Sequence, residues 1–213
     1  MAISPKISII DYGVGNLHSL SKALKHFAED VVLTDERETI RKSDAIILPG
    51  VGAFQSGMSG LRVRSLVETV KNFAQKDKPV LGICLGAQLM LGKGFEFGEH
   101  EGLGIMPGKV EHFPDLSEKE KIPQIGWNGI YARKNSSWQN TILQGTPEKA
   151  NVYFVHSYIL VPEKEENILA LSRYGGYEFC AALKNGNVYG CQFHPEKSGR
   201  IGLEIIKNFI NII

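Results

Sequence analysis

Short apolar runs and helical stripes alternate along the first half of the chain. Short apolar runs are typical of buried strands, and apolar residues that recur every three or four positions are typical of the inward face of a helix. Strands that alternate with helices predict a parallel sheet covered on both faces. The predicted strands are residues 7–10, 31–33, 45–48 and 79–83; the helical stripes are Leu17, Leu20, Leu24 and Phe27, then Val63, Leu66, Val67, Val70 and Phe73, and an apolar segment follows at 85–91.

Beyond Gly102 the pattern changes to short strand-like runs without helical stripes. Gly175-Gly176 and Asn185-Gly186-Asn187 predict hairpin turns between them. We expect an α/β fold: a central mixed, largely parallel sheet flanked by helices, with an additional antiparallel strand region in the C-terminal half, in one domain over residues 1–213. The runs are residues 105–112, 124–128, 152–160, 168–174, 179–183 and 188–193, with a loop-like polar insertion at 135–149 and a final helix marked by Ile201, Ile205, Phe209 and Ile212.

Composition and charge exclude several classes of protein. The 213 residues carry a net charge of +1, which gives no long-range field for a nucleic acid. No apolar stretch is long enough to span a bilayer and no secretory signal is visible, so we expect a cytoplasmic protein. The three cysteines form no paired motif, which argues against a disulfide framework or a structural zinc site. We expect neither a metal nor a cofactor.

One cysteine stands between two glycines where the fourth predicted strand gives way to a helix. In Gly82-Ile83-Cys84-Leu85-Gly86 the glycines allow a sharp turn and close packing. This is the nucleophile-elbow arrangement with Cys in place of Ser. Such a turn lifts the sulfur above the end of the strand, near the positive end of the next helix, and so favours the thiolate. The alternative is a buried Cys that acts as a small apolar side chain.

The last predicted strand ends in a histidine that is followed two residues later by a glutamate. A thiol nucleophile needs an imidazole to move its proton and a carboxylate to orient that imidazole. In the His194-Pro195-Glu196 segment the proline fixes the backbone between the two side chains. A strand-end His beside a solvated Glu is the alternative, but the elbow in the same chain favours catalysis. Cys180 and Cys191 lie within strand-like runs, and we expect both to be core residues.

Glycines also follow the third predicted strand. Ligands of open α/β sheets bind at the carboxyl ends of the strands, so Pro49-Gly50-Val51-Gly52 should lie beside the elbow. Glycines there allow backbone amides to face a developing oxyanion. The alternative is a simple turn that ends a strand.

Six ordered segments resemble the motifs of class I (Cys-His-Glu) glutamine amidotransferases, and closely those of the glutaminase subunits of imidazole glycerol phosphate synthases. The resemblance runs essentially from end to end of the chain and implies a flavodoxin-like fold. An ordered set of matches is more specific than any one motif. The segments are Asp11-Tyr12-Gly13-Val14-Gly15-Asn16, Leu48-Pro49-Gly50-Val51-Gly52-Ala53-Phe54, Gly82-Ile83-Cys84-Leu85-Gly86-Ala87-Gln88, Ile125-Gly126-Trp127-Asn128, Tyr153-Phe154-Val155-His156-Ser157-Tyr158 and Gln192-Phe193-His194-Pro195-Glu196-Lys197-Ser198.

The resemblance implies a role for each matching residue. Cys84 would attack the amide carbon of L-glutamine, His194 would act as base and then as acid, and Glu196 would hold the imidazole. A γ-glutamyl thioester would form, and water would hydrolyse it. The amides of Leu85 and, after a local rearrangement, Val51 would form the oxyanion hole; Gly52, Gln88, Glu96, Ser157 and Tyr158 would hold glutamine; and Asn16, Trp127, Tyr153 and Lys197 would face a partner.

A partner is needed because ammonia released into neutral water is protonated and diluted. The resemblance implies a cyclase subunit with a (βα)8 barrel fold, joined in a heterodimer that makes imidazole glycerol phosphate for histidine biosynthesis. A large aromatic residue and a cation are typical of interface anchors, although Trp127 can also be read as a core indole. We further hypothesise that glutaminase activity stays low until the partner binds, because Gly50 and Val51 must reorient.

Two positions depart from the family pattern, and two other functions stay open. Gln124 stands where the family has His, and residues 92–98 lack the usual Ser before Glu96. These departures concern the partner-facing surface and the rim of the glutamine pocket. A paralogous subunit would feed ammonia to another synthase, for instance in sugar amidination. A catalytically silent interaction subunit would keep only the fold.

Overall fold

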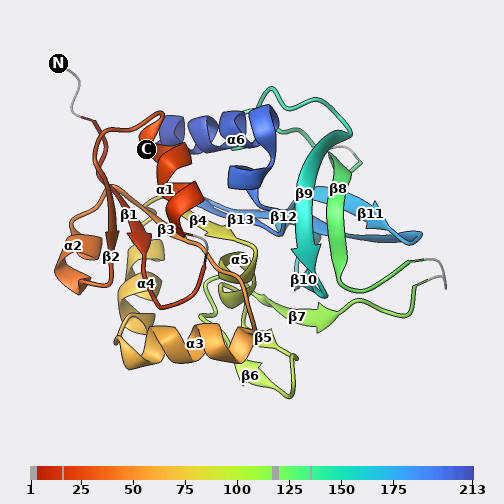
Figure 1. The fold of residues 1–213 in the computed structure, drawn as a ribbon, viewed down its shortest axis with the longest axis horizontal. Helices are drawn as coiled ribbons and strands as arrows, with labels where there is room; N and C mark the ends of the chain where they lie inside the picture. The colour runs from red at the N-terminus through yellow and green to blue at the C-terminus, as the bar shows by residue number, and fades with distance from the viewer. Residues whose placement is uncertain (1–3, 16, 117–119, 135) are drawn as a thin grey trace.

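The computed structural model describes residues 4–15, 17–116, 120–134 and 136–213. Within these ranges one mixed sheet is flanked by helices, with α1 and α6 on one face and α3 and α4 on the other (Figure 1). The predicted α/β fold is confirmed. The helices are α1 Leu17–Lys25, α2 Arg37–Arg41, α3 Phe54–Val63, α4 Val67–Ala74, α5 Leu85–Leu89 and α6 Gly199–Ile212, with 3-10 turns η1 Glu165–Asn167 and η2 Pro195–Lys197.

The strands β2, β1, β3, β4 and β13 lie side by side in this order and run parallel. Every residue of β1, β3, β4 and β13 is buried, because helices cover both faces of this part of the sheet. The bounds of the strands are β1 Ile7–Ile10, β2 Val31–Thr34, β3 Ala45–Leu48, β4 Val80–Ile83, β5 Lys93–Gly94, β6 His100–Glu101, β7 Gly108–His112, β8 Gln124–Tyr131, β9 Ala150–His156, β10 Tyr158–Pro162, β11 Ile168–Tyr174, β12 Tyr177–Asn185 and β13 Val188–Cys191.

The rest of the sheet is largely antiparallel. β12 pairs with β13 and β11, and β11 leads through β8 to β9. The predicted hairpin turns are confirmed, since Gly175-Gly176 joins β11 to β12 and Gly186 lies between β12 and β13. Side chains on β8 and β9 alternate between core and surface, as expected for strands with only one covered face.

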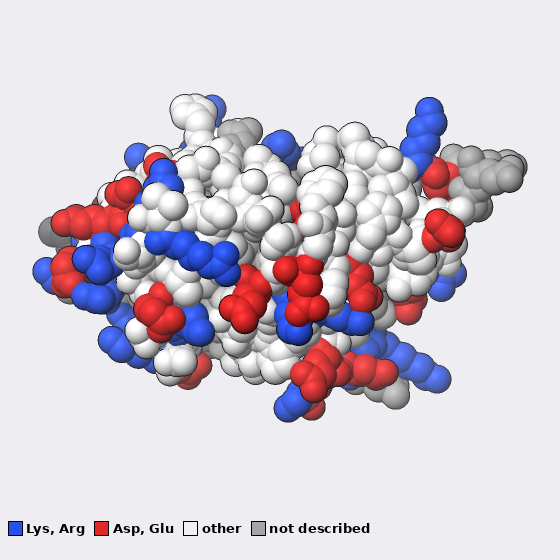
Figure 2. Space-filling view, turned by 90° about the horizontal axis from the view of Figure 1, so that it is seen from below, with Lys and Arg blue, Asp and Glu red and all other residues white. Residues whose placement is uncertain are grey.

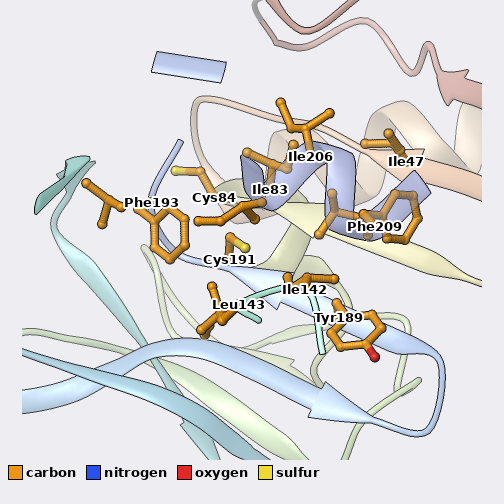
Figure 3. Close-up of a cluster of buried hydrophobic side chains, with 14 of the residues drawn as sticks. Ile47, Ile83, Cys84, Ile142, Leu143, Tyr189, Cys191, Phe193, Ile206 and Phe209 are labelled. Atoms are coloured by element: carbon orange, nitrogen blue, oxygen red, sulfur yellow. The ribbon is translucent and has the colours of Figure 1, made fainter. Parts of the chain in front are cut away.

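β4 and β13 form the seam between the two parts of the sheet. Their register pairs Ile83 with Cys191, so the chain segments that follow both strands emerge next to each other. Figure 3 shows Cys84, Cys191 and Phe193 in one apolar cluster with Ile206 and Phe209 of α6. Cys180 and Cys191 are buried free thiols, which confirms their prediction as core residues.

Several predicted boundaries differ from the observed ones, and three of the differences change an element. The helix expected from Val63 onward is two helices, because α3 ends at Val63 and Ser65 turns the chain with a φ of 55° before α4. Val63 is 82% exposed rather than inward-facing. The run 152–160 is split at Ser157 into β9 and β10, and the run 105–112 is a strand only from Gly108.

The segment 135–149 has no helix or strand in its described part, yet it is more than a polar loop. Trp138, Ile142 and Leu143 are buried, and the Trp138 indole donates a 2.8 Å hydrogen bond to the Leu169 carbonyl. Three apolar side chains therefore fix this insertion to the core. The many polar residues around them led to the prediction of a loop.

Lysines and arginines are interspersed with aspartates and glutamates on the face shown in Figure 2, so this face has no extended field of one sign. None of the described helices has the length and apolar character needed to cross a membrane. Because the described strands join one sheet, we propose that residues 1–213 form one domain, as the sequence predicts.

Candidate functional site

The backbone at Cys84 has the geometry of a nucleophile elbow. Cys84 takes a φ of 50°, which is rare for a residue other than glycine and is strained. Both flanking glycines are required, since a Cβ on Gly86 would lie 1.7 Å from the Leu48 carbonyl oxygen and one on Gly82 would lie 2.7 Å from Ala87. The α5 helix that follows has only five residues, so its dipole contributes less at the sulfur than a long helix would.

The amide of Cys84 donates a 2.7 Å hydrogen bond to the Cys191 carbonyl, which ties the elbow to the strand that leads to His194. His194 Nδ1 lies 2.8 Å from Glu196 Oε1, and both side chains are almost completely buried. A carboxylate only accepts hydrogen bonds, so Nδ1–H is the donor and Nε2 is the basic nitrogen. The structure thus brings together Cys84, His194 and Glu196 at the seam of the sheet.

Burial lowers the pKa of His194, but hydrogen bonding to Cys84 and Glu196 and the charges of both groups raise it to about 9. His194 Nε2 is buried and forms no hydrogen bond of ordinary geometry with another described residue, so it lies near Cys84 without a formed bond to the sulfur. An imidazole that is protonated at neutral pH holds a proton that can be given to a leaving amine.

A cavity of about 380 Å³ opens beside the Cys84 sulfur. A larger and more open hollow of about 830 Å³ runs along α1 and reaches Glu196, but it does not contain the nucleophile, so we take the smaller cavity as the site. All five residues expected to hold glutamine line the cavity, together with both residues expected to form the oxyanion hole. The lining residues are Val51, Gly52, Cys84, Leu85, Gln88, Glu96, Pro123, Val155, His156, Ser157, Tyr158 and Lys197.

Glu96 gives the cavity a fixed negative group. Its Oε2 accepts a 2.7 Å hydrogen bond from the Phe54 amide at the start of α3. This backbone contact orients the carboxylate although residues 92–98 lack the family's serine. The other carboxylate oxygen is left for an ammonium group, as a free amino acid would present.

The predicted oxyanion donors are not both available in this conformation. The amide of Leu85 donates a 3.3 Å hydrogen bond to the Gly50 carbonyl, so that carbonyl occupies the place where an oxyanion would be bound. Gly50 is closely packed, because a Cβ there would lie 2.4 Å from the Tyr12 hydroxyl, and that hydroxyl donates to the Pro49 carbonyl. The segment that follows β3 lies beside the elbow, as predicted.

The outward face of β8 and β9 carries two of the residues expected to face a partner, Trp127 and Tyr153, and a third, Lys197 at the end of η2, lies against them. Trp127 is 53% exposed, which overturns its alternative reading as a core indole. It packs edge-on against Tyr153 at 6.0 Å between ring centroids, and Lys197 Nζ lies 5.8 Å from the centroid of the Tyr153 ring. Ile125 extends this apolar surface. Asn16 lies outside the described residues.

Sequence reasoning missed three polar groups, two of which contact the sulfur and one of which lines the cavity. Gln192 is completely buried and reaches the Cys84 sulfur, and the Val155 carbonyl lies on the cavity wall. Burial lowers the pKa of His156 to about 4, and this outweighs the hydrogen bond with the Tyr158 carbonyl, which by itself raises the pKa. Gln124 is the cross-strand neighbour of His156 and is also buried. Gln192, Val155 and His156 lie in segments that carry the resemblance, but no sequence spacing indicates their contacts.

Among the described residues, no group of three or more His, Cys, Asp or Glu side chains is arranged to hold a metal ion.

Comparisons with known proteins give a consistent result. The family model described as glutamine amidotransferase class-I matches residues 8–212. The chain is 47% identical over 210 residues to the imidazole glycerol phosphate synthase subunit HisH 1 of Legionella pneumophila (strain Lens), covering 97% of this chain and 99% of that one. It is 45% identical to subunit HisH of Aquifex aeolicus, covering 94% of each chain.

Solved structures share the fold at lower identity. A protein described as PurLQS from Thermotoga maritima superposes with a TM-score of 0.73 at 20% identity, covering 98% of this chain and 99% of that one. A glutamine amidotransferase from Thermotoga maritima gives a TM-score of 0.60 at 16% identity, covering 91% of this chain and 77% of that one. At these identities the likeness concerns the fold alone.

Proposed function

The chain belongs to the class I glutamine amidotransferases and is a glutaminase, and from this premise we propose that it supplies ammonia to a cyclase subunit of imidazole glycerol phosphate synthase. The observation that carries the proposal is the convergence of Cys84, His194 and Glu196 beside a cavity lined by the five residues expected to hold glutamine. The choice of synthase rests on relatives that cover nearly the whole chain.

The proposed reaction begins with glutamine in the cavity, its ammonium group against Glu96. The Cys84 thiolate adds to the side-chain carboxamide carbon and forms a tetrahedral oxyanion. The C–N bond then breaks, the proton on His194 Nε2 goes to the leaving nitrogen, and ammonia and a γ-glutamyl thioester remain. Neutral His194 takes a proton from water, whose oxygen attacks the thioester, and glutamate and the thiolate are released. Glu196 keeps Nδ1–H in place throughout.

The oxyanion hole in this proposal requires a rearrangement. The hydrogen bond from the Leu85 amide to the Gly50 carbonyl must break before that amide can face the oxyanion. Turning the peptide between Gly50 and Val51 removes the carbonyl and presents the Val51 amide in its place. Each such donor contributes about 3 to 4 kcal/mol of transition-state stabilisation, so the described conformation corresponds to low activity. Binding of the partner selects the active conformation.

The partner surface in this proposal is the outward face of β8 and β9. Trp127, Tyr153 and Lys197 form one contiguous row, and Lys197 also lines the cavity. A barrel subunit docked there would cover the side of the molecule nearest the cavity and receive ammonia before water protonates it. A large exposed aromatic beside a cation supports this assignment. The cytoplasmic location stays a prediction.

A coupled assay tests the function. The chain is mixed with a candidate cyclase, its nucleotide substrate and glutamine, without ammonium salt, and imidazole glycerol phosphate is measured. We expect product with glutamine, and with Cys84→Ala we expect product only when ammonium salt is added. Absence of product with glutamine, in a mixture that works with ammonium salt, would reject this synthase and favour a paralogous acceptor or a silent subunit.

Activation by the partner is tested with glutamine alone. Glutamate formation is measured for the isolated chain and for the complex with cyclase and its ligand. We expect a much higher rate in the complex, because the oxyanion donors are then aligned. Equal rates would contradict the rearrangement.

A further inference from the structure

A chain of three polar contacts leads from the cavity wall to the Cys84 sulfur. Gln88 Nε2 donates to the Tyr158 carbonyl and to Gln192 Oε1, each at 3.2 Å. Gln192 Nε2 lies 3.8 Å from Cys84 Sγ. The Gln192 side chain is fully buried, two residues before His194. A buried carboxamide is costly unless it is hydrogen-bonded, so these contacts fix its position.

The contacts also fix which end of each amide faces which neighbour. The nitrogen and oxygen of a glutamine amide have similar shapes, so their assignment comes from the surrounding hydrogen bonds. The Tyr158 carbonyl can only accept, so Gln88 must present its NH2 group there. The same NH2 group of Gln88 also donates to Gln192, so Gln192 must turn its side-chain oxygen toward Gln88. The NH2 group of Gln192 is therefore directed at the sulfur.

A second group contacts the sulfur and can only accept. The Val155 carbonyl oxygen lies 3.9 Å from Cys84 Sγ. A protonated thiol can donate to this carbonyl, whereas a thiolate gains nothing from it and accepts from the Gln192 amide instead. The donor thus stabilises the ionised sulfur and the carbonyl stabilises the neutral one.

Cys191 provides an internal comparison. Its sulfur is also buried, and burial is the main cause that raises its pKa. None of the hydrogen bonds found among the described residues is donated to it by a side chain, whereas Cys84 has the Gln192 amide. Two thiols on adjacent chain segments therefore differ in their polar neighbours.

We propose that Gln192 is a positioning residue that stabilises the Cys84 thiolate through its side-chain amide, and that Gln88 holds Gln192 in this orientation. The inference rests on the proposed function, in which Cys84 is the nucleophile. It gives Gln88 a second role, because the same amide that lines the glutamine cavity also orients the donor to the sulfur.

The test is the rate of Cys84 alkylation by iodoacetamide as a function of pH, with the modified cysteine identified by mass spectrometry. Gln192→Met keeps the length and volume of the side chain without a donor. We expect about tenfold slower alkylation at neutral pH, and a rate profile displaced to higher pH, because a charge-assisted hydrogen bond is lost. Gln192→Glu places an acceptor-only group beside the sulfur, so we expect an even larger displacement.

Gln124→Met is the matched control, because it removes another buried glutamine amide that has no contact with the sulfur. We expect its pH profile of Cys84 alkylation to match that of the unchanged chain. A purely structural role for Gln192 would change the alkylation rate without displacing its pH profile. It would also not give Gln192→Glu a larger displacement than Gln192→Met. An unchanged profile in folded Gln192→Met overturns the proposal.

Gln88→Met gives a second route if the Gln192 variants fail to fold. Without Gln88 the orientation of Gln192 is no longer fixed, so we expect a smaller displacement in the same direction, and no displacement overturns the proposal. The alkylation assay needs neither glutamine nor a partner. If the synthase assay fails while the alkylation series holds, the proposed function is wrong and the thiolate assignment stands.

Discussion

The parallel and antiparallel parts of the sheet contribute different things to one site. The parallel part supplies backbone geometry: β4 ends in the strained Cys84 elbow, and the close approach of Gly86 to the Leu48 carbonyl leaves no room for a side chain. The antiparallel part supplies the opposite wall of the cavity, around residues 155–158, and the exposed surface on β8 and β9. Changes in the parallel part should therefore damage the fold, and changes in the antiparallel part should damage function in a folded protein.

The seam between the two parts should show the largest effect. Cys84→Ala and His194→Ala each remove one member of the proposed centre, so we expect each to lower glutamine turnover in the complex by about 10⁴-fold or more. The two residues act as a unit, so the double variant should be no worse than either single one. If the losses of glutamine turnover in the two single variants multiplied in the double variant, a shared centre would be contradicted.

Gly86→Ala tests the backbone constraint on the parallel side. A Cβ would lie 1.7 Å from the Leu48 carbonyl oxygen, so the backbone must shift. We expect a loss of about 3 kcal/mol or more in the free energy of unfolding, measured with urea. Gly190→Ala on β13 is the control, since its Cβ would meet only side-chain atoms, the nearest at 3.1 Å. Equal losses in both variants would refute the constraint.

Trp127→Ala tests the exposed face on the antiparallel side. We expect the affinity for the cyclase to fall by about 30-fold, or about 2 kcal/mol, because exposed aromatic anchors dominate interfaces. The free energy of unfolding should change little. Val63→Ala removes an even more exposed apolar side chain from α3, and it should leave binding unchanged. Calorimetry of the complex measures both, and equal affinities for the two variants would reject this face as the interface.

His156→Phe tests the pH dependence of stability, an effect that is small within any one pH unit. The pKa of His156 is lowered from 6.5 to about 4, so the unfolded chain binds a proton that the folded chain does not. Its contribution to stability is present above pH 6.5 and is lost as pH falls toward 4, by about 1 kcal/mol per pH unit. Phe should flatten urea-derived stability over this range. An unchanged slope would show that His156 is not held neutral.

The parallel part was the easier one to predict. Its strands are continuous apolar runs, and the glycines around Cys84 indicated the elbow because only a residue without a side chain fits there. The break after Val63 was missed, because Val63 continues a helical stripe that the turn at Ser65 interrupts. The anchors Trp138, Ile142 and Leu143 were missed because a polar segment surrounds them.

The site was predicted as a set of residues and not as a set of contacts. The expected glutamine-holding residues do line one cavity, since the motifs that contain them follow strand ends. The contact between Gln192 and the sulfur and the hydrogen bond between the Leu85 amide and the Gly50 carbonyl could not be predicted, because both depend on distances between segments far apart in the sequence. The neutral state of His156 likewise follows from burial, which periodicity does not measure for a single residue.

Covalent labelling tests the central claim most directly. The complex with the cyclase is treated with a diazo-ketone analogue of glutamine, which alkylates a nucleophile in a glutamine site, and the modified residue is identified by mass spectrometry. We predict one label per chain on Cys84, blocked by excess glutamine and abolished by Cys84→Ala. Labelling of Cys180 or Cys191 instead, or no labelling in a complex that consumes glutamine, would contradict the assignment of Cys84 as the nucleophile.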